Sequence, residues 1–190
     1  YIYIYIYIGL ATKFMPFFKF IEFSKFICYI AMFCLSCFNQ SVWWDWEGII
    51  YYELLEKNQT VNAVLYVQQM ERVKMAIQEK RPNRQHNVLL LHDNARPHIA
   101  KMTKEAIQAH GWEVLPHPPY SPDLAPTDFH LFRSLSNAMR GVSFNNDAEL
   151  KAWLDEFFES KTKDFYREGI EKLVERWGKV IDTNGEYIID

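Results

Sequence analysis

The sequence predicts a mixed α/β domain in which helices pack against a sheet, and three observations carry that prediction. A short, continuous apolar run at residues 87–93 is typical of a strand that is buried on both faces. An aromatic and β-branched stretch at residues 43–52 has the composition of a hairpin. Apolar residues recur at helical spacing both before and after these segments. The chain has 190 residues, of which 49% are hydrophobic, so it is long enough for one packed domain and too short for two ordinary ones.

Charge and cysteine usage exclude little. The formal net charge of -3 gives no overall basic field, so any binding of nucleic acid must rely on local basic patches or on metal ions. All three cysteines precede residue 40, so the packed part of the chain does not depend on a disulfide framework, and we expect a reducing compartment.

The first forty residues differ in composition from the rest. Residues 1–8 repeat Tyr-Ile four times, and most of the stretch consists of residues with AT-rich codons. We predict that residues 1–40 are a translated repeat and non-coding-like extension that lies outside the domain, which then covers residues 41–190. Two alternatives stay open. The uncharged run 26–38 is too short to cross a bilayer but resembles the apolar part of a signal peptide, and alternating Tyr-Ile is compatible with a strand that is covered on both faces.

The elements of the domain follow in order from residue 41. The hairpin at 43–52 turns at Asp45 and Gly48, and an amphipathic helix is expected over 60–81, where Pro82 stops it. The buried strand 87–93 ends in Asp93. Asn94 is a possible cap for a helix that runs to Gly111.

The second half of the domain begins with a short strand at 112–117, which leads into a loop stiffened by five prolines between residues 116 and 126. Thr127 or Asp128 can cap the next helix, which ends before Gly141. Asn146 marks a further helix start, and an additional helix around residues 165–177 completes a helical C-terminal layer.

Two carboxylates are candidates for chemistry. Asp93 ends a buried strand and Asp128 starts a helix beyond the stiff loop, and both residue type and placement suit Mg²⁺ or Mn²⁺, which prefer oxygen ligands and can activate the oxygens of a phosphoryl transfer. The alternative is that both are helix caps, a routine role of Asp. Asp123 is interpreted as turn chemistry. The nearby histidines do not have the spacing of a closed zinc site, so we expect His92 and His130 to be supporting or packing residues.

At these residues the sequence becomes recognisable. Residues 91–98 read Leu-His-Asp-Asn-Ala-Arg-Pro-His, and residues 114–128 read Val-Leu-Pro-His-Pro-Pro-Tyr-Ser-Pro-Asp-Leu-Ala-Pro-Thr-Asp. These two motifs, with 34 residues between Asp93 and Asp128, closely resemble the catalytic core of mariner transposases of the Tc1/mariner superfamily. The resemblance extends from about Ser41 to the C-terminus. A similar mariner-derived domain is also part of a fusion with a SET-domain histone methyltransferase.

The resemblance implies an RNase H-like fold in which three aspartates, a DDD triad, bind two divalent metals, Mg²⁺ or Mn²⁺. Members of the family cut DNA at transposon ends and join the ends to TA target sites, and their subunits pair. On that mapping Asp93 is the second catalytic and metal-binding aspartate and Asp128 is the third. The resemblance further implies a nuclear protein whose partners are DNA and a second copy of itself, with no small-molecule substrate and no membrane association.

The departures from the family pattern matter as much as the match. The family's first aspartate lies in a Thr-Gly-Asp-Glu-like strand ahead of the hairpin, whereas residues 1–40 contain no Asp and only one acid, Glu22. Asp45 coincides with an aspartate that the family has in its own hairpin, so we reject it as a substitute. The family's N-terminal helix-turn-helix domains are also not seen.

We therefore expect an incomplete RNase H-like domain, a mariner remnant that is inactive as an enzyme and does not bind transposon ends specifically. Two alternatives stay open: a domesticated DNA- or chromatin-binding module, and a non-functional pseudogene product.

Overall fold

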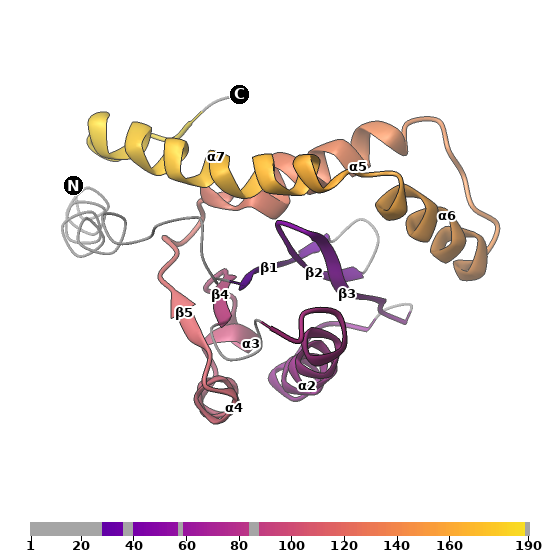
Figure 1. Ribbon diagram of the computed structural model, residues 1–190, viewed down its shortest axis with the longest axis horizontal. Coiled ribbons are helices and arrows are strands. Elements are labelled where there is room, and N and C mark those ends of the chain that lie inside the picture. The colour runs from indigo at the N-terminus through magenta and orange to yellow at the C-terminus, as the bar shows by residue number, and fades with distance from the viewer. Residues whose placement is uncertain (1–27, 36–39, 57–58, 84–87, 189–190) are drawn as a thin grey trace.

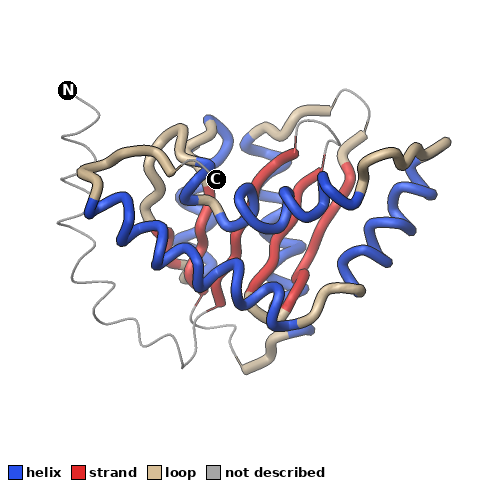
Figure 2. The backbone as a smooth tube through the Cα atoms, turned by 90° about the horizontal axis from the view of Figure 1, so that it is seen from above, coloured by secondary structure: helices blue, strands red, loops and turns tan. Residues whose placement is uncertain are grey.

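The computed structural model describes residues 28–35, 40–56, 59–83 and 88–188. A single sheet stands between two groups of helices (Figure 1). Helices α5, α6 and α7 cover one face, and α2, α3 and α4 cover the other. Figure 2 shows α7 running across the strands. This is the layered, mixed α/β architecture that the sequence predicts.

The sheet has five strands in the order β3-β2-β1-β4-β5. Strand β2 is antiparallel to both of its neighbours, β1 and β3, whereas β4 is parallel to both of its neighbours, β1 and β5. The strands are β1 (Cys28–Leu35), β2 (Gln40–Asp45), β3 (Gly48–Leu54), β4 (Val88–His92) and β5 (Glu113–Leu115). The hairpin and both parallel strands of the second half are confirmed within a few residues of their predicted bounds.

Strand β1 lies ahead of residue 40, where the sequence predicts the domain to begin. It lies at the centre of the sheet, antiparallel to β2 and parallel to β4, and β2 itself begins at Gln40. The apolar run Cys28–Leu35 is a good strand sequence, because a central strand covered by helices on both faces needs no polar alternation. Residues 28–35 and 40 therefore belong to the sheet. The Tyr-Ile repeat lies outside the described residues.

The helical elements fill the intervals between strands and the C-terminal third of the chain. They are α2 (Ala63–Lys80), α3 (Arg96–Ile99), α4 (Lys101–His110), η1 (Pro122–Leu124), η2 (Thr127–Phe132), α5 (Arg133–Ala138), α6 (Asp147–Glu159) and α7 (Lys163–Asp182). Asn62 caps α2 through the backbone N–H of Leu65, and Asn146 caps α6 as its sequence predicts. Gly111 ends α4 in a left-handed conformation with φ 70°.

Two cap predictions are wrong. The helix expected between Asn94 and Gly111 is broken at Ala100, whose extended ψ of 149° separates α3 from α4, and the Asn94 side chain donates instead to the backbone oxygen of His117 at 2.7 Å. Neither Thr127 nor Asp128 is a cap, because both lie inside η2, a π-helical segment that starts after Pro126. Asp128 is therefore not explained by capping.

Two apolar layers hold the helices on the sheet. On the face of α2 and α4, Trp43 and Leu90 pack with Tyr66 and Met70. On the other face, Trp44 packs with the residues of η2, α5, α6 and α7, and its indole Nε1 donates to the Thr127 hydroxyl at 2.9 Å. This buried hydrogen bond ties η2 to β2. None of the helices in the described part of the chain is long and apolar enough to cross a membrane.

Candidate functional site

Asp93 and Asp128 line the same pocket. It measures about 490 Å³ and lies where β4 ends, between the loop after β4, the proline-rich loop and the start of η2. Asn94, Arg96 and His117 also line it. The structure thus brings together the two carboxylates that the sequence places 34 residues apart, and we refer to this site as the carboxylate pocket.

Asp93 is held by two hydrogen bonds to one of its oxygens. It follows directly after β4, and its Oδ1 accepts from the backbone N–H of Ala95 at 2.9 Å and lies 2.5 Å from Nδ1 of His98. Burial alone would raise the pKa of Asp93, but these hydrogen bonds and the imidazole of His98 lower it overall. Asp93 is therefore an ionised carboxylate whose orientation is fixed through Oδ1.

His98 is supported in turn by a buried aromatic cluster. Its ring stacks on His92, with centroids 5.2 Å apart, and lies 4.3 Å from the ring of Tyr66. The Tyr66 hydroxyl is 2.9 Å from Nδ1 of His92. Burial lowers the pKa of His92 to about 3, with His98 adding to the effect, so His92 is neutral near pH 7. His92 is thus a supporting residue, as the sequence indicates. Sequence reasoning gave no specific role to His98, whose contact with Asp93 depends on the short helix α3.

Asp128 is the second carboxylate of the pocket. Its position in η2 is set by its neighbour Thr127, which accepts the Trp44 hydrogen bond. Burial raises the pKa of Asp128 to about 7, and the negative charge of Asp93 adds to the shift. Two carboxylates whose pKa values are driven apart in one pocket are typical of a site that binds a cation or transfers a proton.

Strand β1 lies beside this site and packs next to η2. Ala31 is opposite Leu91 of β4, and Met32 is opposite His92, the residue before Asp93. On the other side Phe33 is opposite Val42, which packs on the face of the sheet that carries η2. Continuing the Met32–His92 register by one residue places residue 33 next to Asp93. No Asp or Glu occurs anywhere in Cys28–Leu35.

The donor set fits a divalent cation only in part. Two carboxylates facing one pocket match the oxygen preference of Mg²⁺ and Mn²⁺, and the raised pKa of Asp128 shows that its ionised form lacks a compensating positive charge. Among the described residues, however, no group of three or more His, Cys, Asp or Glu side chains could hold a metal.

Three other acids and histidines have structural contacts. Asp45 accepts a hydrogen bond from the Arg81 guanidinium at 2.8 Å and another from the backbone N–H of Gly48 in the hairpin turn. These contacts give Asp45 a structural role, and it does not replace the family's first aspartate as a metal ligand. His130 is 2.8 Å from the backbone oxygen of Phe165 through Nε2 and packs on its ring. Asp123 lies in the 3-10 turn η1, and its Oδ2 accepts from the backbone N–H of Ile188 at 3.1 Å, a contact that sequence reasoning missed.

Comparison with known proteins identifies this type of domain. A family model described as "Transposase (partial DDE domain)" matches residues 39–87. The crystal structure of the catalytic domain of Mos1 mariner transposase superposes with a TM-score of 0.86 at 41% identity, over 95% of this chain and 93% of that one. The structure of the mariner Mos1 paired end complex with Mg matches with a TM-score of 0.87 at 34% identity, over 100% of this chain and 64% of that one. The domain is therefore a transposase catalytic domain with an RNase H-like fold.

Two full-length relatives narrow the assignment. The chain is 48% identical over 150 residues to Mariner Mos1 transposase from Drosophila mauritiana, covering 77% of this chain and 44% of that protein. It is 41% identical over 150 residues to Histone-lysine N-methyltransferase SETMAR from Homo sapiens, covering 77% of this chain and 22% of that protein. The chain belongs to the mariner transposase family, and it spans less than half the length of these two relatives.

Proposed function

We propose that Asp93 and Asp128 form the remaining part of a divalent-metal site whose ancestral activity is cleavage of DNA at transposon ends and strand transfer into TA sites. The observation that carries this proposal is the convergence of the two motif aspartates in one pocket. A bound Mg²⁺ or Mn²⁺ supplies Lewis-acid stabilisation of phosphoryl oxygens and activation of the attacking oxygen. Solved Mos1 catalytic domains are described with Mn and with Mg, which supports this choice of metals.

We infer further that this polypeptide is inactive as a nuclease. The strand that pairs with β4, Cys28–Leu35, contains no Asp or Glu at any position. Two carboxylates alone hold Mg²⁺ weakly, since this ion keeps most of its waters and needs further ligands. A shared ligand for two ions is then missing, so the paired-metal chemistry of phosphoryl transfer is lost rather than slowed.

Restoring the carboxylate tests both inferences. The Phe33→Asp variant places an acid at the register position next to Asp93, and we expect it to gain Mn²⁺ affinity over the wild type in a calorimetric titration. We also expect slow Mn²⁺-dependent nicking of supercoiled plasmid, which the double variant Phe33→Asp/Asp128→Asn lacks. Phe33→Asn is the matched control for the loss of the aromatic ring. The inference of inactivity would be contradicted if the wild-type chain nicked plasmid robustly with Mg²⁺ and if the Asp93→Ala substitution abolished this nicking.

The proposed partners follow from the relatives. Mos1 structures are described as paired-end complexes with a transposon end, which supports DNA and a second copy of the chain as ancestral partners. A nuclear location is part of the same proposal, because the substrate of this chemistry is chromosomal DNA.

The similarity to SETMAR favours a second candidate function, a retained DNA- or chromatin-binding module. Retention of DNA with a salt dependence that reports several phosphate contacts, without any cleavage, would favour that candidate.

A further inference from the structure

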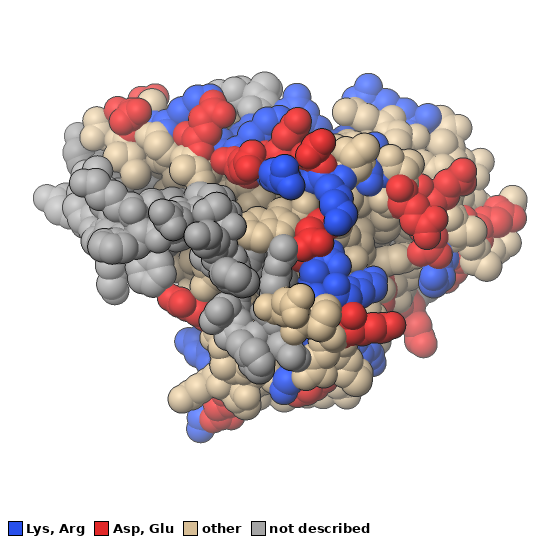
Figure 3. Space-filling model, viewed as in Figure 1, with Lys and Arg blue, Asp and Glu red and all other residues tan. Residues whose placement is uncertain are grey.

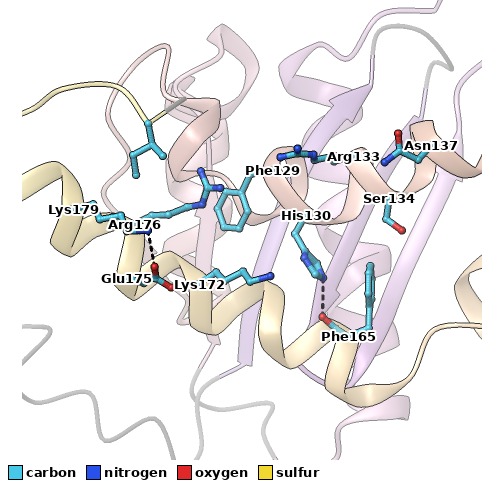
Figure 4. A pocket seen from close by; sticks show the side chains of 11 residues that line it. Phe129, His130, Arg133, Ser134, Asn137, Phe165, Lys172, Glu175, Arg176 and Lys179 are labelled. Atoms are coloured by element: carbon cyan, nitrogen blue, oxygen red, sulfur yellow. Dashed lines mark hydrogen bonds and ion pairs between the residues drawn. The ribbon is translucent and has the colours of Figure 1, made fainter. Parts of the chain in front are cut away.

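A second hollow, of about 540 Å³, lies between η2–α5 and α7. Four cationic side chains line it, and we call it the basic groove: Arg133, Lys172, Arg176 and Lys179. Glu175 is the one carboxylate among the lining residues. Figure 4 shows that Arg133 comes from one wall and the other three cations from the facing helix α7, with the aromatic ring of Phe129 between the walls.

Residues that are neighbours in the sequence line the carboxylate pocket and the basic groove. Asp128 lines the pocket, and the next residue, Phe129, lines the groove. A second link is Arg176, which donates to the backbone oxygen of Asp123 at 3.2 Å, one residue after Pro122 of the pocket. The Arg176 guanidinium also lies 4.2 Å from the centroid of the Phe129 ring. These contacts hold one cation of the groove in a fixed position beside the carboxylate pocket.

The remaining cations extend this positive surface along α7. Lys172 is exposed and forms no ion pair within the part of the chain that the structure describes, and Figure 4 shows its amine directed into the space between the helices. Lys179 is also exposed and pairs with Glu175 at 2.6 Å, a surface pair of little energetic weight. In the space-filling view, Lys and Arg side chains gather among acidic ones along the edge formed by α7 (Figure 3).

The charge distribution between the two hollows is complementary to a DNA backbone. The carboxylate pocket contains two acids and a single arginine, Arg96, so it offers little attraction to phosphates on its own. The adjoining groove concentrates four cations on a chain whose net charge is -3. Cations grouped at one place on an otherwise acidic protein bind polyanions locally, with release of the counterions that the phosphates had condensed.

We propose that the basic groove binds the phosphate backbone of duplex DNA and guides it past the carboxylate pocket. The proposal rests on the function proposed above, since it assumes that the carboxylates face DNA. The basic groove is the surface through which this domain binds the duplex. Lys172 and Lys179 contact phosphates as point charges, and Arg133 and Arg176 offer planar guanidinium groups suited to paired phosphate oxygens.

The experiment compares two charge-matched double variants of the full chain. Lys172→Gln/Lys179→Gln removes two cations of the groove. Lys101→Gln/Lys104→Gln removes two exposed cations from α4, which packs on the opposite face of the sheet. Each pair contains one lysine in an i,i+4 ion pair, Lys179 and Lys101. Binding of a fluorescent, mixed-sequence duplex is followed by anisotropy over a series of salt concentrations, after melting curves confirm that both variants fold.

The groove variant should bind several-fold more weakly than the wild type, and its logarithmic salt slope should be shallower by about one for each lysine that contacts a phosphate. The α4 variant should match the wild type. Equal losses in both variants, or no loss in either, would overturn the groove as the binding surface. Failure of the wild type to bind at about 50 mM salt, where phosphate contacts are strong, would overturn it as well. The metal-site proposal is judged separately by Mn²⁺ titration and by Phe33→Asp.

Discussion

Metal binding by the carboxylate pocket should depend steeply on pH between 6 and 8, because Asp128 must lose its proton to become a ligand. Burial and the charge of Asp93 raise the pKa of Asp128 to about 7. With that pKa, roughly one in eleven molecules has an ionised Asp128 at pH 6, and roughly ten in eleven at pH 8. Since the apparent affinity scales with the competent fraction, Mn²⁺ should bind about tenfold more tightly at pH 8 than at pH 6.

The assay is a Mn²⁺ titration followed by the electron paramagnetic resonance signal of the free ion, repeated across this pH range. His92 and His117 do not interfere, since burial lowers their pKa values to about 3 and about 4 and leaves both rings neutral. Asp128→Asn should bind Mn²⁺ weakly at every pH and lose the dependence. Asp147→Asn, at the exposed start of α6, is the matched control and should behave as the wild type.

Two results would refute this reasoning: a wild-type affinity that is unchanged from pH 6 to pH 8, or a dependence that persists in Asp128→Asn. Protein stability gives an independent check. A carboxyl whose pKa is higher in the folded than in the unfolded state binds its proton more tightly when folded, so its contribution to stability falls as pH rises from about 4 to about 7. Asp128→Asn should therefore raise the melting temperature at pH 8 and leave it unchanged at pH 4.

Two further predictions concern residues around the site. Gly169→Ala should destabilise the fold by about 1–3 kcal/mol in urea denaturation, because a Cβ at this position would lie 2.5 Å from the His130 ring and overpack the site. Gly178→Ala on the same helix is the control. A Cβ there meets nothing within 4 Å, so this variant should be more stable than the wild type by up to about 1 kcal/mol. His98→Ala should raise the pKa of Asp93 and weaken Mn²⁺ binding, because the hydrogen bond to Asp93 is lost. His98→Gln should restore part of the Mn²⁺ affinity. An unchanged Mn²⁺ affinity in a folded His98→Ala protein would show that the imidazole does not position Asp93.

The sequence predicts the elements of this fold better than its site. The hairpin, the strand β4 and the capped helices α2 and α6 are encoded locally, by aromatic pairs, apolar runs and Asn caps. The break at Ala100 and the π-helical start of η2 are not, because both depend on contacts made elsewhere. Thr127 reads as a cap in sequence and is instead the acceptor of a buried hydrogen bond from Trp44, 83 residues away.

The same distinction applies inside the carboxylate pocket. Asp93 and Asp128 stand out because each follows a stiff element, and their convergence can be expected from a family resemblance. The supporting contacts cannot be read in this way, since His98 reaches Asp93 only because α3 is a single short turn. The links from Asp123 to the C-terminal segment and to Arg176 similarly join residues more than 50 positions apart.

Strand β1 separates what the sheet requires from what catalysis requires. A central position between β2 and β4 requires a backbone that pairs on both sides and favours an apolar sequence, and Cys28–Leu35 has both properties. The metal-dependent chemistry proposed for the carboxylate pocket needs a further carboxylate, and the next position in register beside Asp93 is Phe33. An apolar strand can thus preserve the architecture of the domain, and with it the basic groove on α7, without supplying the carboxylate that the proposed chemistry needs. Restoring a single carboxylate at residue 33 is therefore the change that most directly separates the fold from its activity.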